Sequence, residues 1–453
     1  MDNAEHPCFR VMMLPWLAHG HISPFLELAR RLSTHNIVVY LCSTPVNLRS
    51  VQEGGQFDCL KDFPLIHLVE LHLPVVGQGD EDENYLQPHL HTTKNLPTHR
   101  MPELKTAFDR AAPDFDRLVC SLSPDVLIYD LLQPWAPIVA SRRGIPAVLF
   151  LTVAAYTFVI FSHCLLRPPS DTRAAEFAKT LYSVANGLTD GERFLQCIHS
   201  SSGFVAIRTF REMEGNYISH LSAVLGKEIL PVGPLLSEAV GSDRGGEDRV
   251  EKWLNTREPA TVVFASVGTE YFMAEEEIAE ISRGLELSGL FYIWVVRSHG
   301  DGGVDETKRR YSGGSVSERG LVLEGWAPQK KILAHASVGV FVTHCGWSSV
   351  LEGMSNGVAM VALPMQLDQP LNAELMVQLG VAVQAEEVGG CYRADEVARC
   401  IREVAVGEEG ESVRRKAKEM ARLMACKGDE GVNELVGRLS ALACKTETHV
   451  MKP

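Results

Sequence analysis

The chain has 453 residues, of which 45% are hydrophobic and 22% charged, and its formal net charge at pH 7 is −14. This length suffices for two or three domains with large apolar cores. The acidic balance argues against nucleic acid or an anionic membrane as the main partner, because both select clustered lysine and arginine. The eleven cysteines form no CxxC pair and no zinc-ligand spacing, which favours free thiols in a reducing, cytoplasmic setting.

Strand-like runs alternate with helical patterns from the first residues onward, which predicts parallel α/β units. Residues 9–14 form an apolar strand, and a short loop that contains His21 follows it. Ser23 and Pro24 suit the cap and the first residue of a helix. Apolar residues at helical spacing over 25–32 continue that helix.

Two later segments of the first half also end in chemically informative residues. The strand over 125–130 ends in Asp130. Residues 145–166 are apolar over a length that could span a bilayer, but Pro146 opens the run and Thr152 interrupts it. A buried strand followed by a buried helix is the preferred interpretation, and a membrane span is the alternative. The polar, acidic N-terminus does not resemble a secretory signal.

The strand and helix pattern restarts in the second half, where residues 261–268, 338–344 and 358–364 read as strands. We expect an N-terminal domain over 1–236, a linker over 237–249, a C-terminal domain over 250–432, and a helix and tail of uncertain placement over 433–453. The predicted architecture is two doubly wound α/β domains facing a cleft. Ligands bind such sheets beyond the carboxyl ends of the strands, which selects the loops 15–23, 130–135 and 344–349.

The stretch THCGWSSVLEG, Thr343 to Gly353, places Ser348 and Ser349 at the start of a helix that follows a buried strand. A helix N-terminus offers N–H groups and a positive dipole end, so phosphate binds there readily. Plain capping is the alternative, because serine is among the best capping residues. Glu352 lies one turn later on the same face, where its carboxylate could hold a vicinal diol or simply face solvent.

Two further sites fit a nucleotide sugar. Trp326 stands at a loop–helix junction, where its flat face could stack on a base, although a lone tryptophan is more often part of a core. Asp368 and Gln369 follow a strand and offer an acceptor beside an amide, which suits a ring rich in hydroxyls. Taken alone, that pair is an ordinary polar loop.

Together, residues 326–369 resemble the nucleotide-sugar box of the plant family 1 UDP-glycosyltransferases, with W, Q at the fourth place, HCGW, E and a closing DQ. LPWLAHGHISP, the strand ending in Asp130, and ASVGTE extend the resemblance over the whole chain. It implies the GT-B fold of two Rossmann-like domains, with donor on the C-terminal and acceptor on the N-terminal domain. The closing Gln usually accompanies a glucosyl donor in this family, so UDP-glucose is the expected co-substrate. No metal-ligand cluster is visible in the sequence, and no metal and no further cofactor are expected. The residues expected to contact the donor are Gly268, Thr269, Trp326, Ala327, Gln329, His344, Gly346, Trp347, Ser348, Ser349, Glu352, Asp368 and Gln369.

The resemblance also assigns roles within that set. Trp326 is expected to stack on uracil, Glu352 to hold the ribose, and Gln329 to lie near the uridine. His344, Ser349 and Thr269 are expected at the diphosphate, and Asp368 and Gln369 at the sugar hydroxyls. This chain departs from the family at Ser348, where the family generally has Asn, and at Ala359, where it usually has Pro.

A histidine with a carboxylate partner suits the transfer of a sugar to a hydroxyl, because the acceptor oxygen must lose a proton as it attacks. His21 and Asp130 each follow a strand of the first domain, and the resemblance matches them to the base and its partner. His19 is the weaker candidate. A single displacement predicts inversion, from an α-linked donor to a β-glycoside.

The acceptor is expected on loops around 15–16, 86–98 and 132–135, which are apolar, aromatic and rich in His and Thr. Several stretches resemble the subgroup that adds a sugar to a flavonoid or terpenoid glycoside. An aglycone O-glucosyltransferase is the alternative, and a non-catalytic UDP-sugar binder or a nucleotide-sugar hydrolase or isomerase would be a different class. A monomer without stable membrane insertion is expected. No P-loop, nucleophile elbow or dinucleotide fingerprint is present in the sequence.

Overall fold

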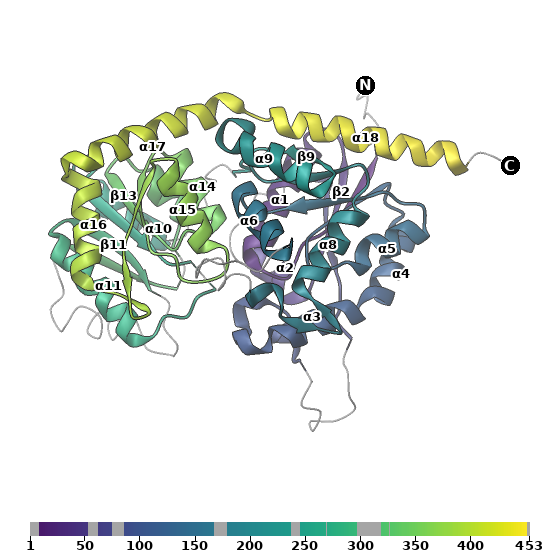
Figure 1. Cartoon of the computed structure of the whole chain (residues 1–453), viewed down its shortest axis with the longest axis horizontal. Coiled ribbons are helices and arrows are strands. Elements are labelled where there is room, and N and C mark those ends of the chain that lie inside the picture. Colours follow the sequence, from purple (N-terminus) through teal and green to yellow (C-terminus); the bar gives the residue numbers. More distant parts are fainter. Residues whose placement is uncertain are drawn as a thin grey trace. The chain divides into compact units, whose positions relative to one another are not determined.

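The computed structural model describes residues 9–52, 62–74, 86–166, 179–236, 245–268, 270–296, 319–325 and 327–450. The chain forms two compact units, of which unit 1 comprises residues 1–237 and 429–453, and unit 2 comprises residues 238–428. Unit 1 therefore contains both ends of the chain. In Figure 1, its first elements are purple and its last helix is yellow.

Unit 1 is built on a parallel sheet of seven strands. Their order is β3 (Ile66–Glu70), β2 (Val38–Ser43), β1 (Arg10–Leu14), β4 (Val126–Tyr129), β5 (Ala147–Leu151), β8 (Phe204–Ile207) and β9 (Glu228–Pro231). Successive residues of β1 enter different apolar clusters, with Met12 and Leu14 in one and Val11 and Met13 in the other. Because strand side chains alternate between faces, this sheet is buried on both sides.

Helices cover both faces of that sheet. They are α1 (His19–Ser33), α2 (Pro45–Val51), α3 (Met101–Arg110), α4 (Ala112–Leu122), α5 (Trp135–Arg142), α6 (Ala155–Leu166), α8 (Asp190–Ser200), α9 (Arg211–Leu225) and α18 (Glu430–Val450). Short 3₁₀ turns lie at Pro88–Leu90, Thr93–Asn95 and Thr98–Arg100, and a small hairpin pairs Val184–Ala185 with Leu188–Thr189.

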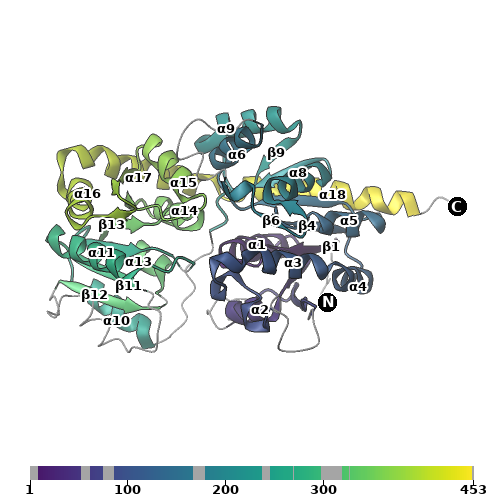
Figure 2. The same ribbon diagram turned by 60° about the horizontal axis from the view of Figure 1, so that its bottom comes forward.

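Unit 2 has a six-stranded parallel sheet, again doubly wound (Figure 2). The strand order is β12 (Gly320–Glu324), β11 (Phe291–Val296), β10 (Val262–Ser266), β13 (Val338–Thr343), β14 (Ala359–Ala362) and β15 (Ala382–Gln384). Its helices are α10 (Gly245–Leu254), α11 (Glu275–Ser288), α13 (Gln329–Ala334), α14 (Trp347–Ser355), α15 (Gln369–Gln378), α16 (Ala394–Val406) and α17 (Glu408–Lys427), and a hairpin pairs Glu387–Val388 with Cys391–Tyr392.

The first helix begins earlier than the sequence pattern predicts. The carbonyl of Ala18 accepts hydrogen bonds from the N–H groups of His21 (3.0 Å) and Ile22 (2.9 Å), which starts α1 at His19 rather than at Ser23. Pro24 therefore lies inside the helix. The correction matters for the site, because His21 stands in the first turn of a helix and not in a loop.

In three other segments, the structure shows which elements the residues form. The last five residues of the expected linker, 245–249, belong to α10, and 237–244 lie outside the described residues. Helix α18 starts at Glu430 and belongs to unit 1, where Val432, Leu435, Leu439 and Ala443 are buried in the same cluster as α1. Residues 145–166 form strand β5 followed by helix α6. Among the described helices, none has the length and apolar character needed to cross a bilayer.

Candidate active site

A histidine and a carboxylate meet where two strands of the unit 1 sheet end. His21 follows β1 and Asp130 follows β4, which are hydrogen-bonded neighbours. His21 Nδ1 lies 2.8 Å from Asp130 Oδ2. The Asp130 side chain is fully buried, whereas the His21 side chain remains 23% exposed. The carboxylate is thus a fixed internal group, and the imidazole can be reached from outside.

The backbone holds the Asp130 carboxylate in place. Oδ2 accepts the N–H of Trp16 at 3.0 Å, and Oδ1 accepts the N–H of Leu131 at 2.7 Å. Because an ionised carboxylate can only accept hydrogen bonds, it directs the His21 proton to Nδ1. The lone pair of the neutral ring then lies on Nε2, which becomes the atom able to take a proton.

A third residue, which the sequence analysis assigned only to the strand-helix segment, joins this pair. Thr152 Oγ1 lies 3.1 Å from His21 Nδ1. Thr152 is the first residue after the buried strand β5, the next strand along the same sheet. The available signal was its position, because a polar residue directly after a buried parallel strand lies on the ligand-binding edge. His19, by contrast, contacts Ser23 Oγ through Nδ1 at 3.3 Å.

The expected acceptor segment is tied to the same edge of the sheet. The carbonyl of His91 accepts hydrogen bonds from Thr44 Oγ1 (2.8 Å) and Asn47 Nδ2 (3.3 Å), both just after β2. The N–H of Thr93 donates to the carbonyl of Leu17 at 3.0 Å, close to His21 in the chain. These contacts hold a stretch of 3₁₀ turns beside the His21–Asp130 pair. Burial lowers the pKa of His91, which keeps that ring neutral.

In unit 2, two glycines define the position of the His344 ring. A Cβ on Gly268 would lie 2.5 Å from His344 Nε2, and a Cβ on Gly346 would lie 2.6 Å from the same atom. Both distances are below van der Waals contact, so a side chain at either place would displace the ring. Gly268 also has a φ of +80°, in the region that favours glycine. His344 directly follows β13, at the carboxyl edge of the second sheet.

The electrostatic state of His344 follows from its surroundings. Burial lowers the pKa of His344 to about 4, so the ring is neutral at pH 7. Its Nδ1 is buried and has no hydrogen-bond partner among the described residues.

Helix α14 starts three residues after His344 and presents its N-terminus at this edge. Ser349 Oγ accepts a hydrogen bond from Gln329 Nε2 at 3.1 Å, and the same nitrogen donates to Glu352 Oε2 at 2.8 Å. Lys330 Nζ lies 3.9 Å from Glu352 Oε1. Three residues expected to contact the UDP-sugar thus lie together, namely Gln329, Ser349 and Glu352. The Glu352 carboxylate is held by protein side chains rather than by solvent alone.

The loop before α15 is ordered by its own side chains. Gln369 Oε1 accepts the N–H groups of Met365 and Gln366, each at 2.9 Å, so the amide nitrogen is the part of this side chain that can donate. Asp368 Oδ2 accepts a hydrogen bond from Asn372 Nδ2 at 2.8 Å. These bonds present both expected sugar-binding residues from one rigid turn.

Asn372 is a second residue whose importance only the structure reveals. Its fully buried Nδ2 also donates to the carbonyl of Cys345 at 3.0 Å. One side chain therefore links the loop after β13 to the loop after β14. The only sequence signal is a polar residue one turn into a helix that starts at Gln369, which is too common to single it out.

Four further residues were expected to contact the UDP-sugar. Thr269 and Trp326 lie outside the described residues. The side chain of Trp347 is buried, and this residue is the first of α14. The carbonyl of Ala327 accepts the N–H of Gln329 at 2.8 Å and so starts the turn into α13. Among the described residues, no group of three or more His, Cys, Asp or Glu side chains could hold a metal ion.

The two units match known proteins independently. Residues 9–237 match the family model for a glycosyltransferase N-terminal domain, and residues 245–408 match the model for UDP-glucoronosyl and UDP-glucosyl transferase. The crystal structure of Glycyrrhiza uralensis UGT73P12 has a TM-score of 0.80 to this chain at 21% identity and covers 98% of both chains. That likeness confirms the predicted GT-B fold of two Rossmann-like units.

Similarity to curated relatives extends over nearly the full length. Mogroside IIIx synthase of Siraitia grosvenorii is 43% identical over 451 residues, covering 95% of this chain and 93% of the relative. Flavanone 7-O-glucoside 2''-O-beta-L-rhamnosyltransferase of Citrus maxima is 37% identical, covering 99% of this chain and all of the relative. The chain therefore belongs to the UDP-glucoronosyl and UDP-glucosyl transferase family and is a UDP-sugar-dependent glycosyltransferase.

Proposed function

We propose that this enzyme transfers glucose from UDP-glucose to a sugar hydroxyl of a small, largely apolar flavonoid or terpenoid glycoside, with inversion at the anomeric carbon. One observation carries the catalytic part, namely the 2.8 Å contact between His21 Nδ1 and the buried Asp130 carboxylate. It orients Nε2 as the atom that can remove a proton from an acceptor hydroxyl.

In the proposed reaction, the acceptor oxygen loses its proton to His21 Nε2 as it attacks the anomeric carbon of the donor. The bond from that carbon to the UDP oxygen breaks, and UDP leaves with the bonding electron pair. Asp130 stabilises the imidazolium that forms and keeps the ring in one orientation. Thr152, also close to Nδ1, restricts the same ring. Attack opposite the leaving group turns the α-linked donor into a β-glycoside.

The leaving diphosphate requires stabilisation of negative charge. We assign this role to the N-terminus of α14, whose dipole favours anions, together with His344 and Ser349. Gly268 and Gly346 serve by leaving room for the ring. Thr269 joins this group on the sequence resemblance alone.

For the rest of the donor, Glu352 and Gln329 are assigned to the ribose and uridine, and Asp368 and Gln369 to the glucose hydroxyls. Trp326 is assigned to the uracil ring on the sequence resemblance alone. The fixed turn around Gln369 supports a defined sugar site, since its amide oxygen is already engaged. The Citrus relative is named as a rhamnosyltransferase, so the activity test must include UDP-rhamnose as a sugar donor.

The glycoside acceptor rests on relatives. The same Citrus protein is named for the 2''-O position of a flavanone 7-O-glucoside, which is a hydroxyl of an existing sugar. Its identity of 37% over nearly the full chain supports a similar choice here. Buried His91, Thr92 and Thr93 beside the dyad supply polar groups within an otherwise apolar surrounding, which suits a glycoside with an apolar aglycone.

The test is incubation with UDP-glucose, UDP-rhamnose and matched pairs of aglycone and monoglycoside. Tandem mass spectrometry detects a disaccharide fragment when the new sugar is attached to the old one, and NMR coupling constants give the anomer. We expect faster reaction of the monoglycoside and a β linkage. Equal or faster reaction of the aglycone would replace the proposal by an aglycone O-glucosyltransferase. Absence of product from every pair, with UDP-glucose bound, would favour a non-catalytic binder.

A further inference from the structure

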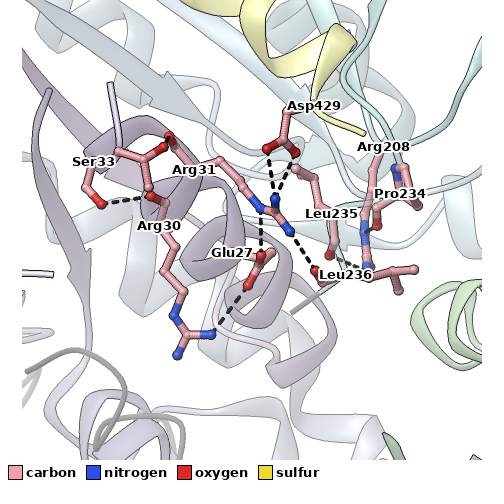
Figure 3. A network of polar contacts seen from close by, with 10 residues as sticks. Glu27, Arg30, Arg31, Ser33, Arg208, Pro234, Leu235, Leu236 and Asp429 are labelled. Atoms are coloured by element: carbon pink, nitrogen blue, oxygen red, sulfur yellow. Dashed lines mark hydrogen bonds and ion pairs between the residues drawn. The ribbon is translucent and has the colours of Figure 1, made fainter. Parts of the chain in front are cut away.

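Arg31, in the last turn of α1, binds three parts of unit 1 at once (Figure 3). Its Nη1 donates to both carboxylate oxygens of Asp429, at 2.8 and 2.9 Å. Its Nη2 donates to the carbonyl of Leu236 at 3.1 Å. Its Nε donates to Glu27 Oε1 at 3.0 Å, one turn earlier on the same helix. All five donors of a guanidinium lie in one plane, so these contacts fix its orientation.

The two distant partners stand at the two chain crossings between the units. Leu236 lies at the end of the first stretch of unit 1, which runs to residue 237. Asp429 is the residue with which the chain returns to unit 1 after residue 428. One side chain therefore holds the departing and the returning segment together, although the whole of unit 2 separates them in sequence.

The departing segment is held more firmly than an ordinary chain end. Leu235 is buried and has a φ of +47°, which is strained for a residue with a side chain. Arg208 donates to the carbonyls of Pro234 (2.8 Å, from Nε) and Leu235 (3.2 Å, from Nη2). With the Arg31 contact to Leu236, two guanidinium groups bind three successive carbonyls (Figure 3). Such a strained conformation persists only when its surroundings impose it.

The returning segment turns sharply and then packs at once. Gly428 has φ 51° and ψ −134°, a conformation that favours glycine. Three residues later, a Cβ on Gly431 would lie 2.6 Å from the carbonyl oxygen of Pro231, so the first turn of α18 sits directly against the end of β9. The Asp429 contact with Arg31 lies between these two features and fixes the point of entry.

The helix that carries this anchor also carries the proposed base. His21 stands in the first turn of α1, and Glu27 and Arg31 stand in its later turns. Both ends belong to one continuous helix of 15 residues, with Pro24 inside it. The ends of both chain crossings are thus bound to the same helix whose start presents the imidazole.

We propose that Arg31 is a positioning residue of the transferase, which fixes both chain crossings of unit 1 to the helix that presents His21. This inference rests on the proposed function, because its activity readout is sugar transfer. Loss of the anchor leaves the His21–Asp130 contact and the donor-binding residues unchanged. It frees the segments that connect the donor-binding unit, so donor and base are aligned in a smaller fraction of complexes. The expected defect is in kcat, with donor affinity unchanged.

The experiment compares R31A with a matched control, R438A. Arg438 also links α18 to the rest of unit 1, through an ion pair with Glu228 on β9, but it touches neither crossing. We expect R31A to lower kcat about tenfold or more, since small misplacements of reacting groups are costly. The Kd for UDP-glucose by calorimetry should not change. R438A should keep kcat within about twofold of the wild type. Its melting temperature should fall about as much as that of R31A.

Hydrogen exchange provides a readout that does not depend on activity. In R31A, the amides of residues 232–236 and 429–435 should lose protection together, whereas R438A should affect α18 alone. If R31A does not fold, D429N weakens one arm of the anchor, because the charge and one acceptor oxygen are lost, while the Leu236 and Glu27 contacts stay; it should show the same pattern in weaker form. Wild-type kcat in a folded R31A or D429N protein would overturn the inference. Absence of transfer by the wild type would instead overturn the proposed function.

Discussion

The polar side chains at the carboxyl edges of the two sheets are held in different ways. In unit 1, the Asp130 carboxylate is satisfied within the protein by His21 and two backbone N–H groups. In unit 2, two glycines leave room for the His344 ring, and its Nδ1 has no hydrogen-bond partner among the described residues. In the proposed mechanism, the first edge orients the base and the second edge binds the diphosphate. Mutations at the two edges should therefore separate catalysis from donor binding.

The largest effect is expected at the first edge. His21→Ala should lower the transfer rate by about 10²–10⁴, because the general base is lost. Donor binding should be unchanged, since the residues assigned to UDP lie in unit 2. Rates at saturating substrates and calorimetric Kd values for UDP-glucose test both parts. Asp130→Asn should behave similarly, and the double variant should be little worse than His21→Ala, because the two residues act as a unit. Near-normal transfer by His21→Ala would contradict the assignment.

A second, smaller effect should appear at the other edge. Gly346→Ala would place a Cβ 2.6 Å from His344 Nε2, so the ring must move. We expect donor affinity to weaken by about tenfold, the equivalent of one charged hydrogen bond, while acceptor affinity stays the same. Gly437→Ala is the matched control, because an added Cβ there meets nothing within 4 Å. In a His344→Ala background the glycine substitution should have little further effect, and an undiminished effect would show that the clash lies elsewhere.

The buried imidazole should also give unit 2 a characteristic pH dependence. The pKa of His344 is lowered by burial to about 4, against an ordinary value near 6.5 in the unfolded chain. Between these values the unfolded state binds more protons, so this group makes stability fall as the pH falls from 6.5 to 4. Denaturant unfolding across that window should show a shallower loss of stability in His344→Gln than in the wild type. Parallel curves for the two proteins would refute this origin.

The smallest effect concerns Ser348, at the start of α14, where the family generally has Asn. An asparagine side chain reaches further and adds an amide donor that could meet a phosphate oxygen. Ser348→Asn should therefore tighten UDP-glucose binding, by about tenfold at most, because a bridging water can already serve the shorter serine. Calorimetry on both forms measures the change, and acceptor affinity is the internal control. Weaker binding by the Asn form would indicate that this loop has been reshaped around serine.

The sequence was informative where predicted strand ends and family motifs coincide. His21 and Asp130 were each placed after a strand of the first domain, and the resemblance paired them; the box from 326 to 369 predicted the second edge. Thr152 and Asn372 could not be assigned in the same way, because their roles depend on side-chain direction within a packed loop. The start of α1 was misplaced because Pro24 reads as a first helical residue, whereas the Ala18 carbonyl starts the helix earlier. Arg31 and Asp429 are 398 residues apart, and no local pattern connects them.

The return of the chain to unit 1 has a consequence for how this protein is made. Leu435 and Leu439, in α18, are fully buried in the core that also contains α1 and β1. A ribosome finishes every strand of unit 1 long before it adds these side chains, so that apolar surface stays uncovered while unit 2 is synthesised. Domains otherwise tend to fold as they emerge, N-terminal first. Here the first-made unit is the last that can be completed, and removal of the C-terminal helix would leave unit 1, not unit 2, with an open core.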